Sequence, residues 1–188
     1  RVTGQPFADS MDWVAPAVML TLAGLRLAEM KTLNGVGVYV DNAAFGFFPF
    51  AVPNAYGELV FPVFFWEAVT ALVIGVLLAV RYARGVGNAG DTALTCMLLL
   101  GLSQVFWESL REDDFLRFGF VRLNQLWGVL LATGAIGLWF KPAHATHAQV
   151  LRSILLVYAC VGVLIVVEFG LDKLPIANEV LYGAMALA

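Results

Sequence analysis

Charged residues are scarce in this chain, and neither sign of charge dominates. Only 13% of the 188 residues are charged, whereas 61% are hydrophobic and the mean hydropathy is +0.83. Soluble domains usually carry about a quarter charged residues, so this composition argues against an ordinary soluble domain. The net charge of −3 leaves no basic excess, which argues against nucleic acid as a partner. The composition indicates an integral membrane protein.

Cysteine and histidine are equally rare. Cys96 and Cys160 each lie inside an apolar run. A disulfide framework or a metal site would need more ligands or closer spacing. His144 and His147 lie in a segment that we interpret as a solvated loop. We therefore expect no metal and no cofactor.

Long apolar windows are what the sequence has instead. A helix that spans a membrane needs about 20 predominantly apolar residues. The sequence predicts five full spans and a partial sixth from about residue 176; the five lie at about 11–30, 59–80, 93–110, 123–140 and 150–170. No internal repeat or second domain is visible. We expect an all-α, polytopic transmembrane helix bundle in which residues 1–188 form a single transmembrane domain.

One segment between the predicted spans has a different character. Residues 34–59, NGVGVYVDNAAFGFFPFAVPNAYGEL, are rich in Gly, Pro and Phe and have no helical period. Irregular backbone is tolerated at membrane depth only where protein or a watery cavity surrounds it. We therefore expect an ordered, irregular loop outside the membrane, or a re-entrant piece.

The two ends of the chain indicate a piece of a longer protein. Residue 1 is Arg rather than Met, and the final EVLYGAMALA supplies about half of a spanning helix. We expect the chain to be incomplete at both ends.

The distribution of Lys and Arg predicts the orientation. The loop at 81–90 carries two arginines with no acidic residue, and the loop at 141–152 carries Lys141 and Arg152 with none. Cytoplasmic loops carry an excess of Lys and Arg, so we assign both loops to the cytoplasm. Alternation then places 31–58 and 111–122 on the outer side.

Polar side chains recur inside the predicted spans, where an ionisable group is costly and marks a functional site by default. Spacings of three and four residues place such side chains on one face of a helix. Those concerned are Arg26, Glu29, Glu67 with its neighbour Trp66, Gln104, Glu108, Arg111, Asn124 and Gln125. The orientation gathers them toward the outer leaflet, which predicts a hydrated pocket that opens outward. The alternative is that they form interhelical ion pairs or reach the membrane interface.

The two arginines suggest a chemistry for this pocket. A guanidinium stays charged when partly desolvated, and its planar fork suits phosphate oxygens. A pocket that contains Arg26 and Arg111 could hold a phospholipid headgroup. Carboxylates beside them could orient the guanidinium groups or act as a general base.

Four stretches carry a family resemblance: DWVAPAVMLTLAGLR (12–26), FPVFFWEAV (61–69), FWESLREDD (106–114) and RLNQLWGVLL (122–131). Their order resembles that of the prolipoprotein diacylglyceryl transferase family over about residues 10–140. In that family an Asp-x-x-Ala-Pro helix leads into Gly-Arg-x-Gly-Asn-Phe, and His-Pro-x-x-Leu-Tyr-Glu opens the next helix. Glu-x-x-Arg then precedes a Gln that starts the last helix.

The resemblance implies transfer of a diacylglyceryl group from phosphatidylglycerol to the cysteine thiol of a lipoprotein-precursor peptide, with glycerol phosphate leaving. It implies a multi-pass protein of the bacterial cytoplasmic membrane whose active site faces the outer leaflet. Residue by residue, Arg26, Glu67, Glu108, Arg111 and Gln125 match the motifs. Together with the pocket, this predicts catalytic roles for Arg26, Arg111 and Glu108. The predicted substrate-binding residues are Glu29, Glu67, Trp66, Gln104, Asn124 and Gln125.

The sequence also departs from the family pattern. Leu25 stands in place of the motif's glycine, Glu29 in place of its asparagine, Trp66 in place of its tyrosine and Phe61 in place of its histidine. A non-catalytic lipid-binding paralogue or a membrane transporter therefore remains an alternative function.

Overall fold

The computed structural model describes residues 7–112, 117–118, 121–140 and 147–173. This part of the chain is mostly helical, as the sequence predicts. Its five α-helices are α1 (Phe7–Ala28), α2 (Val63–Ala83), α3 (Asp91–Ser109), α4 (Leu123–Phe140) and α5 (His147–Lys173). The helices fall at the five predicted windows, and the partial sixth span lies outside the described residues.

The sequence prediction places the start of the second helix too early. The sequence predicts a helix from residue 59, whereas α2 begins at Val63. Leu59 and Val60 form strand β2 (Leu59–Val60) instead, which pairs with β1 (Val52–Pro53). Hydropathy cannot separate a short apolar strand from the first turn of an apolar helix, because both are buried. Pro62 then fits as the residue before the helix, because a backbone N–H at a helix start has no intrahelical acceptor and its absence from proline costs little.

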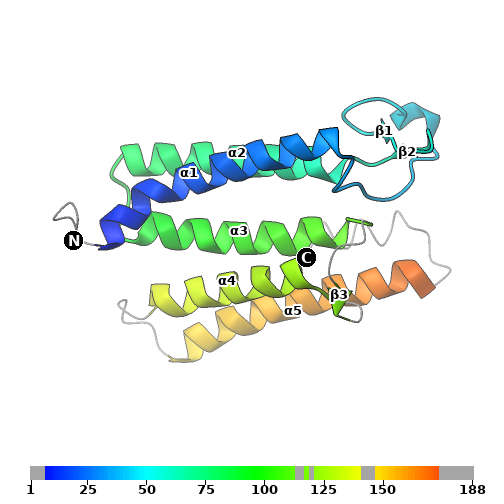
Figure 1. The fold of residues 1–188 in the computed structure, drawn as a ribbon. Helices are drawn as coiled ribbons and strands as arrows, with labels where there is room; N and C mark the ends of the chain where they lie inside the picture. The colour runs from blue at the N-terminus through cyan, green and yellow to red at the C-terminus, as the bar shows by residue number, and fades with distance from the viewer. Residues whose placement is uncertain (1–6, 113–116, 119–120, 141–146, 174–188) are drawn as a thin grey trace. The chain divides into compact units, whose positions relative to one another are not determined.

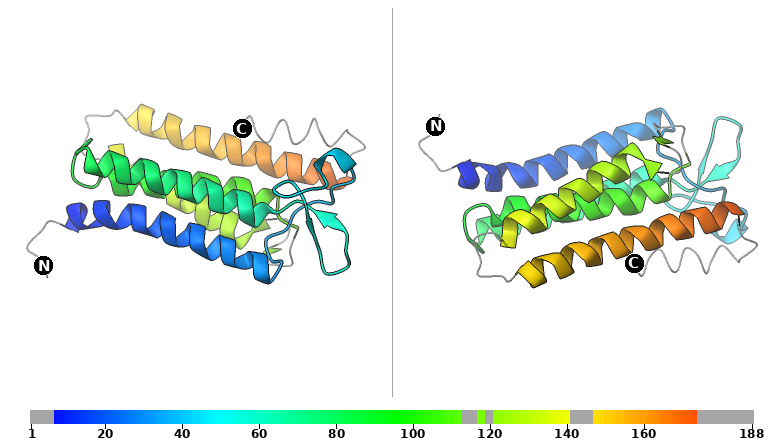
Figure 2. Two further views of the ribbon diagram at one scale, coloured as in Figure 1. Left: turned by 90° about the horizontal axis from the view of Figure 1, so that it is seen from above. Right: turned by 90° about the horizontal axis from the view of Figure 1, so that it is seen from below.

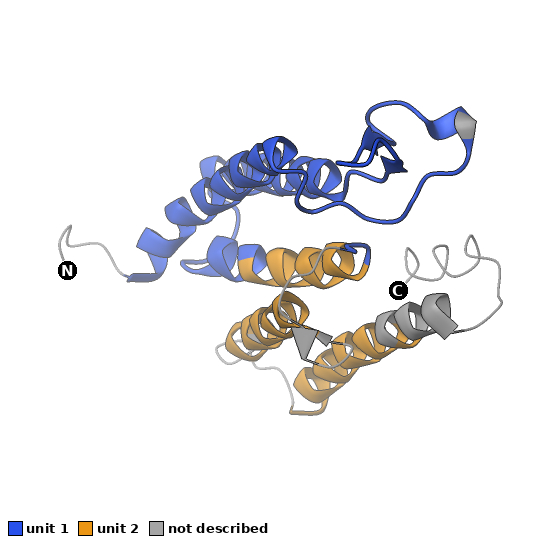
Figure 3. Cartoon of the chain, turned by 45° about the vertical axis from the view of Figure 1, so that its right-hand side comes forward, with its two compact units in different colours: residues 1–96, 110–114 blue, residues 97–109, 115–188 orange. Residues whose placement is uncertain are grey.

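The chain divides into two compact units (Figure 3). The first unit comprises residues 1–96 and 110–114, and the second comprises residues 97–109 and 115–188. The boundary therefore falls within α3, and each unit is described below by itself.

In the first unit, α1 and α2 pack antiparallel along their length (Figure 1). A Cβ atom added to Gly75 of α2 would lie 3.1–3.3 Å from side-chain atoms of Leu20 and Met19 of α1, so a small residue permits this close approach. Both helices keep apolar side chains on their outer faces, among them Leu27 and Leu77. Both are also long and apolar enough to cross a membrane.

A cap without α-helix joins the end of α1 to the start of α2, and both views in Figure 2 show it at the same end of the two helices. The cap comprises residues 32–62 and includes the 3-10 turn η2 (Ala43–Phe45) and the β1–β2 hairpin, in which Val52 pairs with Val60. Val52 and Val60 pack with Phe64 of α2 in a small apolar core. The cap is therefore an ordered structure built on the first turn of α2.

The start of α3 also belongs to the first unit and is attached to α1 by Asp12. The buried Asp12 carboxylate accepts hydrogen bonds from the backbone N–H groups of Gly90 (2.7 Å) and Ala93 (2.8 Å). Gly90 directly precedes α3 and Ala93 lies in its first turn, where backbone N–H groups have no intrahelical acceptor. Asp12 thus caps α3 from another helix, and its negative charge suits the positive end of the helix dipole.

The second unit contains the rest of α3, the hairpin of β3 (Arg117–Phe118) and β4 (Val121–Arg122), and the helices α4 and α5. The backbones of α3 and α4 come into contact at Gly101 and Gly128, where an added Cβ would collide with the facing carbonyl group. The apolar core between α4 and α5 contains Ala132, Ile136 and Val157.

Candidate functional site

Four charged side chains of the first unit form a closed ring in which positive and negative groups alternate. Arg26 Nη1 lies 2.5 Å from Glu29 Oε1, and Arg26 Nε lies 2.8 Å from Glu67 Oε1. Arg111 lies 3.5 Å from Glu67 Oε2 through Nη1 and 3.6 Å from Glu29 Oε2 through Nη2. Each carboxylate therefore bridges the same two guanidinium groups. We call these four residues the charged ring.

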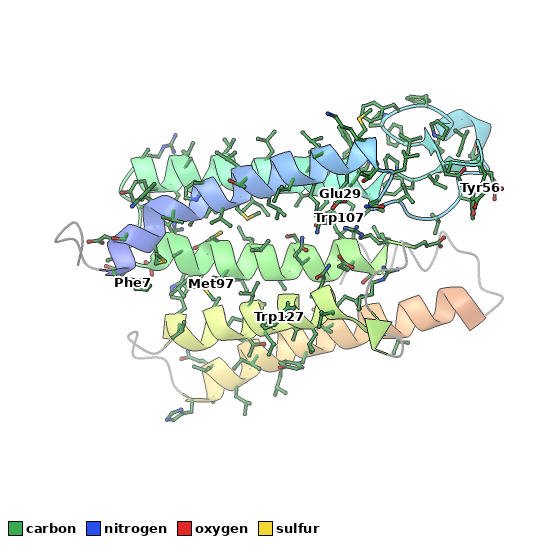
Figure 4. All side chains as sticks on the ribbon, in the orientation of Figure 1. Phe7, Glu29, Tyr56, Met97, Trp107 and Trp127 are labelled. Atoms are coloured by element: carbon green, nitrogen blue, oxygen red, sulfur yellow. The ribbon has the colours of Figure 1, made fainter. Side chains whose placement is uncertain are left out.

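Three members of the charged ring come from one end of the α1–α2 pair. Arg26 lies in the last turn of α1, and Glu29 begins the 3-10 turn η1 (Glu29–Lys31) that follows it. Figure 4 shows Glu29 where α1 meets the cap. Glu67 lies near the start of α2, and because the helices run antiparallel this start lies beside the end of α1. The spacing of three residues between Arg26 and Glu29 then places both toward Glu67.

The fourth member, Arg111, is positioned by the beginning of the cap. The backbone N–H of Glu112 donates to the carbonyl of Val36 (3.0 Å), and the N–H of Gly37 donates to the carbonyl of Phe61 (2.8 Å). A Cβ added to Gly37 would lie 2.5 Å from the Leu110 carbonyl oxygen. The cap therefore passes between the start of α2 and the chain after α3, and only glycine fits at this contact.

The charged ring is largely shielded from solvent. The Glu67 side chain is 2% exposed and Arg111 is 5% exposed, whereas Arg26 and Glu29 are 14% and 21% exposed. Taking four charges out of water is costly unless each has a partner of opposite sign, and the ring supplies those partners. Interhelical ion pairs, the alternative that the sequence leaves open, are thus present between α1 and α2. Two guanidinium groups on shared carboxylates also present the forked donors that suit phosphate oxygens.

Trp66 faces the cap. Its indole N–H donates to the carbonyl of Pro49 (3.0 Å), and its ring packs against Phe50 and Phe65 at centroid distances of 6.0 and 5.6 Å. Trp66 therefore fixes the cap to α2 at the position directly before Glu67.

A second polar group lies within the second unit, between α3 and α4. The Asn124 amide donates to Glu108 Oε1 (2.7 Å), and the Gln125 amide donates to Ser109 Oγ (3.1 Å). Gln125 also accepts a hydrogen bond from the backbone N–H of Arg122 (2.9 Å). Gln104 lies one turn before Glu108 on α3 and is half-buried. These contacts attach the start of α4 to the end of α3.

The nine predicted site residues thus fall into separate sets. The charged ring brings together Arg26, Glu29, Glu67 and Arg111, whereas Glu108, Asn124 and Gln125 interact within the second unit. Sequence reasoning did not select Arg122, which lies in the predicted outer segment 111–122 and is 1% exposed in the structure. The available signal was its position directly before an apolar helix. In the described ranges, no three His, Cys, Asp or Glu side chains could hold a metal ion together.

Comparison with known proteins gives two matches in sequence. The family model of prolipoprotein diacylglyceryl transferase matches residues 1–141. A phosphatidylglycerol–prolipoprotein diacylglyceryl transferase of Parasynechococcus marenigrum (strain WH8102) is 33% identical in an alignment 156 residues long. The match covers 74% of this chain and 56% of that protein. The chain therefore spans about half the length of this curated relative. No solved structure matches the chain significantly.

Proposed function

Because the chain belongs to the prolipoprotein diacylglyceryl transferase family, we propose that it transfers a diacylglyceryl group from phosphatidylglycerol to the cysteine thiol of a lipoprotein precursor. The thiol sulfur forms a bond to the carbon of the diacylglyceryl group that carries the phosphate. The bond between that carbon and the phosphate oxygen breaks, and glycerol phosphate leaves with the bonding electrons. The thiol proton passes to a base.

The observation that supports this proposal is the pairing of Arg26 and Arg111 in the charged ring. Negative charge grows on the phosphate oxygen as the carbon–oxygen bond breaks. Donors that are already in place stabilise such charge without reorganisation. In this proposal both guanidinium groups bind the lipid phosphate, and Glu67 orients them because it forms an ion pair with each.

The other predicted residues have supporting roles. Trp66 holds the cap over the start of α2, beside the lipid phosphate. Glu108 remains a predicted catalytic residue, as an orienting or proton-accepting carboxylate, and Asn124 fixes its position by a hydrogen bond. Gln104 and Gln125 remain predicted substrate-binding residues. Loss of transfer in Glu108→Gln with phosphatidylglycerol binding retained would support a role for Glu108 in the chemical step.

We further propose a multi-pass protein of the bacterial cytoplasmic membrane whose cap and charged ring face outward. The proposal rests on the two candidate spans α1 and α2 and on the arginines of the loop after α2. Its test uses single cysteines at Tyr56, an 88% exposed residue of the cap, and at Arg84, after α2, with Cys96 and Cys160 replaced by alanine. A membrane-impermeant maleimide should label Tyr56→Cys in intact cells and Arg84→Cys only after lysis. The reverse pattern would overturn the orientation.

The proposed activity is tested with the full-length protein in detergent, labelled phosphatidylglycerol and a peptide that carries a lipoprotein-type cysteine. Label should pass to the peptide, and Arg26→Ala and Arg111→Ala should each reduce the rate at least about a hundredfold, the scale of losing one donor to a developing anion. Arg84→Ala is the matched control, because Arg84 is exposed and lies outside the charged ring. Transfer that survives both ring substitutions would overturn the proposal.

Lipid binding without transfer is the second candidate, and one observation favours it. Glu29 and Glu67 together compensate both guanidinium groups, so the charged ring has no formal net charge. A protein that binds phosphatidylglycerol but transfers no label to any peptide would fit this candidate.

A further inference from the structure

Glu29 occupies the place in the charged ring where an anion would be bound by both arginines. Its Oε1 contacts Arg26 Nη1 at 2.5 Å, and its Oε2 lies 3.6 Å from Arg111 Nη2. One oxygen thus faces each guanidinium group. A phosphodiester also presents two non-bridging oxygens, which share one negative charge, so it would use the same two donors.

The two carboxylates of the charged ring are not equivalent. Glu67 projects from α2, is 2% exposed and approaches Arg26 Nε at 2.8 Å. Glu29 projects from a 3-10 turn of three residues and is 21% exposed. Its Oε2 is buried yet accepts no hydrogen bond within the described part of the chain. A buried carboxylate oxygen without a donor is destabilising, and Glu29 is also the more exposed of the two carboxylates.

The space around Glu29 Oε2 is kept open by a glycine. A Cβ added to Gly35 would lie 2.5 Å from Glu29 Oε2 and 3.2 Å from Arg111 Nη2. Gly35 has a φ of +69°, which glycine adopts without strain. Backbone therefore lines this position, and an oxygen of another anion could replace Oε2 there once the Glu29 side chain rotates away.

We propose that Glu29 is an internal anion that competes with the phosphate of the lipid and so sets the affinity of the site. The inference rests on the proposed function, because it takes the charged ring to be the phosphate site. Glu67 keeps the arginines in place, and Glu29 gives way when a phosphodiester enters. Glu29 is thus a specificity-determining residue that weakens the binding of anionic headgroups.

The test compares the binding of dihexanoyl phosphatidylglycerol to the full-length protein and to Glu29→Gln by calorimetry in a non-ionic detergent at low salt. Glutamine keeps the shape and removes the charge. The variant should bind about tenfold more tightly, the scale of removing one like charge beside the ligand in partly shielded surroundings. The gain should shrink at high salt because added ions screen the interaction.

Matched variants separate this role from others. Glu58→Gln removes the same charge from an exposed turn of the cap, where Glu58 pairs with Asn54, and should leave the affinity unchanged. Glu67→Gln should weaken binding, because it removes the carboxylate that orients both arginines. A parallel titration with glycerol phosphate distinguishes sources: equal tightening there would show that the site responds to the phosphate group itself, whereas tightening confined to the lipid would show that the acyl part must also be present.

Three results would overturn the inference. Equal affinity of Glu29→Gln and the unchanged protein, with binding lost in Arg26→Ala, would leave the phosphate site intact and reject competition by Glu29. Weaker binding by Glu29→Gln with a lower unfolding temperature would show that Glu29 only stabilises the fold. No binding of phosphatidylglycerol by any variant or by the unchanged protein would reject the proposed function and this inference together.

Discussion

Arg26 Nε of α1 lies 2.8 Å from Glu67 Oε1 of α2, and this contact joins the two candidate membrane spans at the end that carries the cap. The pair is shielded from water, so each charge depends on the other for compensation. The contact therefore links the packing of the first unit to the geometry of its proposed phosphate site.

The first prediction concerns the coupling between these two residues. Arg26→Gln and Glu67→Gln should each lower the free energy of unfolding by about 3–5 kcal/mol, because each leaves a buried charge with fewer partners. The double variant should lose less than the sum, with a coupling energy of about 1–3 kcal/mol. Unfolding in mixed micelles measures all of these energies.

The matched pair for this cycle is Arg84→Gln with Glu58→Gln. Glu58 lies in the cap before α2 and Arg84 follows the far end of α2, so their effects should add to within about 0.5 kcal/mol. A cycle at Arg26 and Glu67 that is equally additive would contradict the ion pair.

The second prediction concerns Asp12, which caps α3 from α1. Asp12→Ala should lower the free energy of unfolding by about 1–3 kcal/mol, because the N–H groups of Gly90 and Ala93 lose a charged acceptor. The rate of amide hydrogen exchange at the first turn of α3 should rise in the same variant. Asp9→Ala is the control, because Asp9 lies near the start of α1, the helix that carries Asp12. This variant should change stability by no more than about 0.5 kcal/mol. Unchanged exchange in Asp12→Ala would show that the hydrogen bonds of Asp12 to the start of α3 are dispensable.

The third prediction concerns Gly37. Gly37→Ala should force the Leu110 carbonyl to move, since the added Cβ would lie 2.5 Å from its oxygen. The cost should be about 1–3 kcal/mol of stability, as for other overpacked sites. Because Arg111 directly follows Leu110, phosphatidylglycerol binding should weaken as well. Gly24→Ala is the control, since nothing lies within 4 Å of a Cβ added there, and it should keep full binding.

The fourth prediction concerns the contact of α3 with α4 in the second unit. Gly101→Ala should lower stability by about 1–3 kcal/mol, because its Cβ would collide with the carbonyl oxygen of Gly128 and lie 2.8 Å from the backbone nitrogen of Ala132. Gly134→Ala on α4 adds the same methyl group where nothing lies within 4 Å. Thermal unfolding should separate the two variants, and equal midpoints would mean that the helices do not meet at Gly101.

Much of the fold follows from local sequence. The apolar windows predicted all five described helices, because a long apolar run buries its backbone polar groups most simply as a helix. The start of α2 was placed wrongly, because the pairing of Leu59 and Val60 with β1 is a contact with another segment. The motif order also led to the family, which the match over residues 1–141 confirms.

The candidate site was predicted less completely. Arg26 and Glu29 could be placed together from their spacing, because both lie on one helical face. The burial of Arg122 and the role of Gly37 could not be read from the sequence, since each depends on residues from other segments. The catalytic and binding roles of all these residues stay predictions until the variants are measured.

The sequence by itself determined which segments are apolar helices and which polar residues interrupt them, because both depend on composition and spacing along one chain. Only the tertiary structure decided that Glu29 and Glu67 would share the same two arginines, while Glu108, three residues before Arg111, would interact with Asn124 instead. Charges attract across space regardless of their separation in sequence. Which of them meet is therefore set by the antiparallel packing of α1 and α2 and by the path of the cap, which brings Arg111 to the end of both helices.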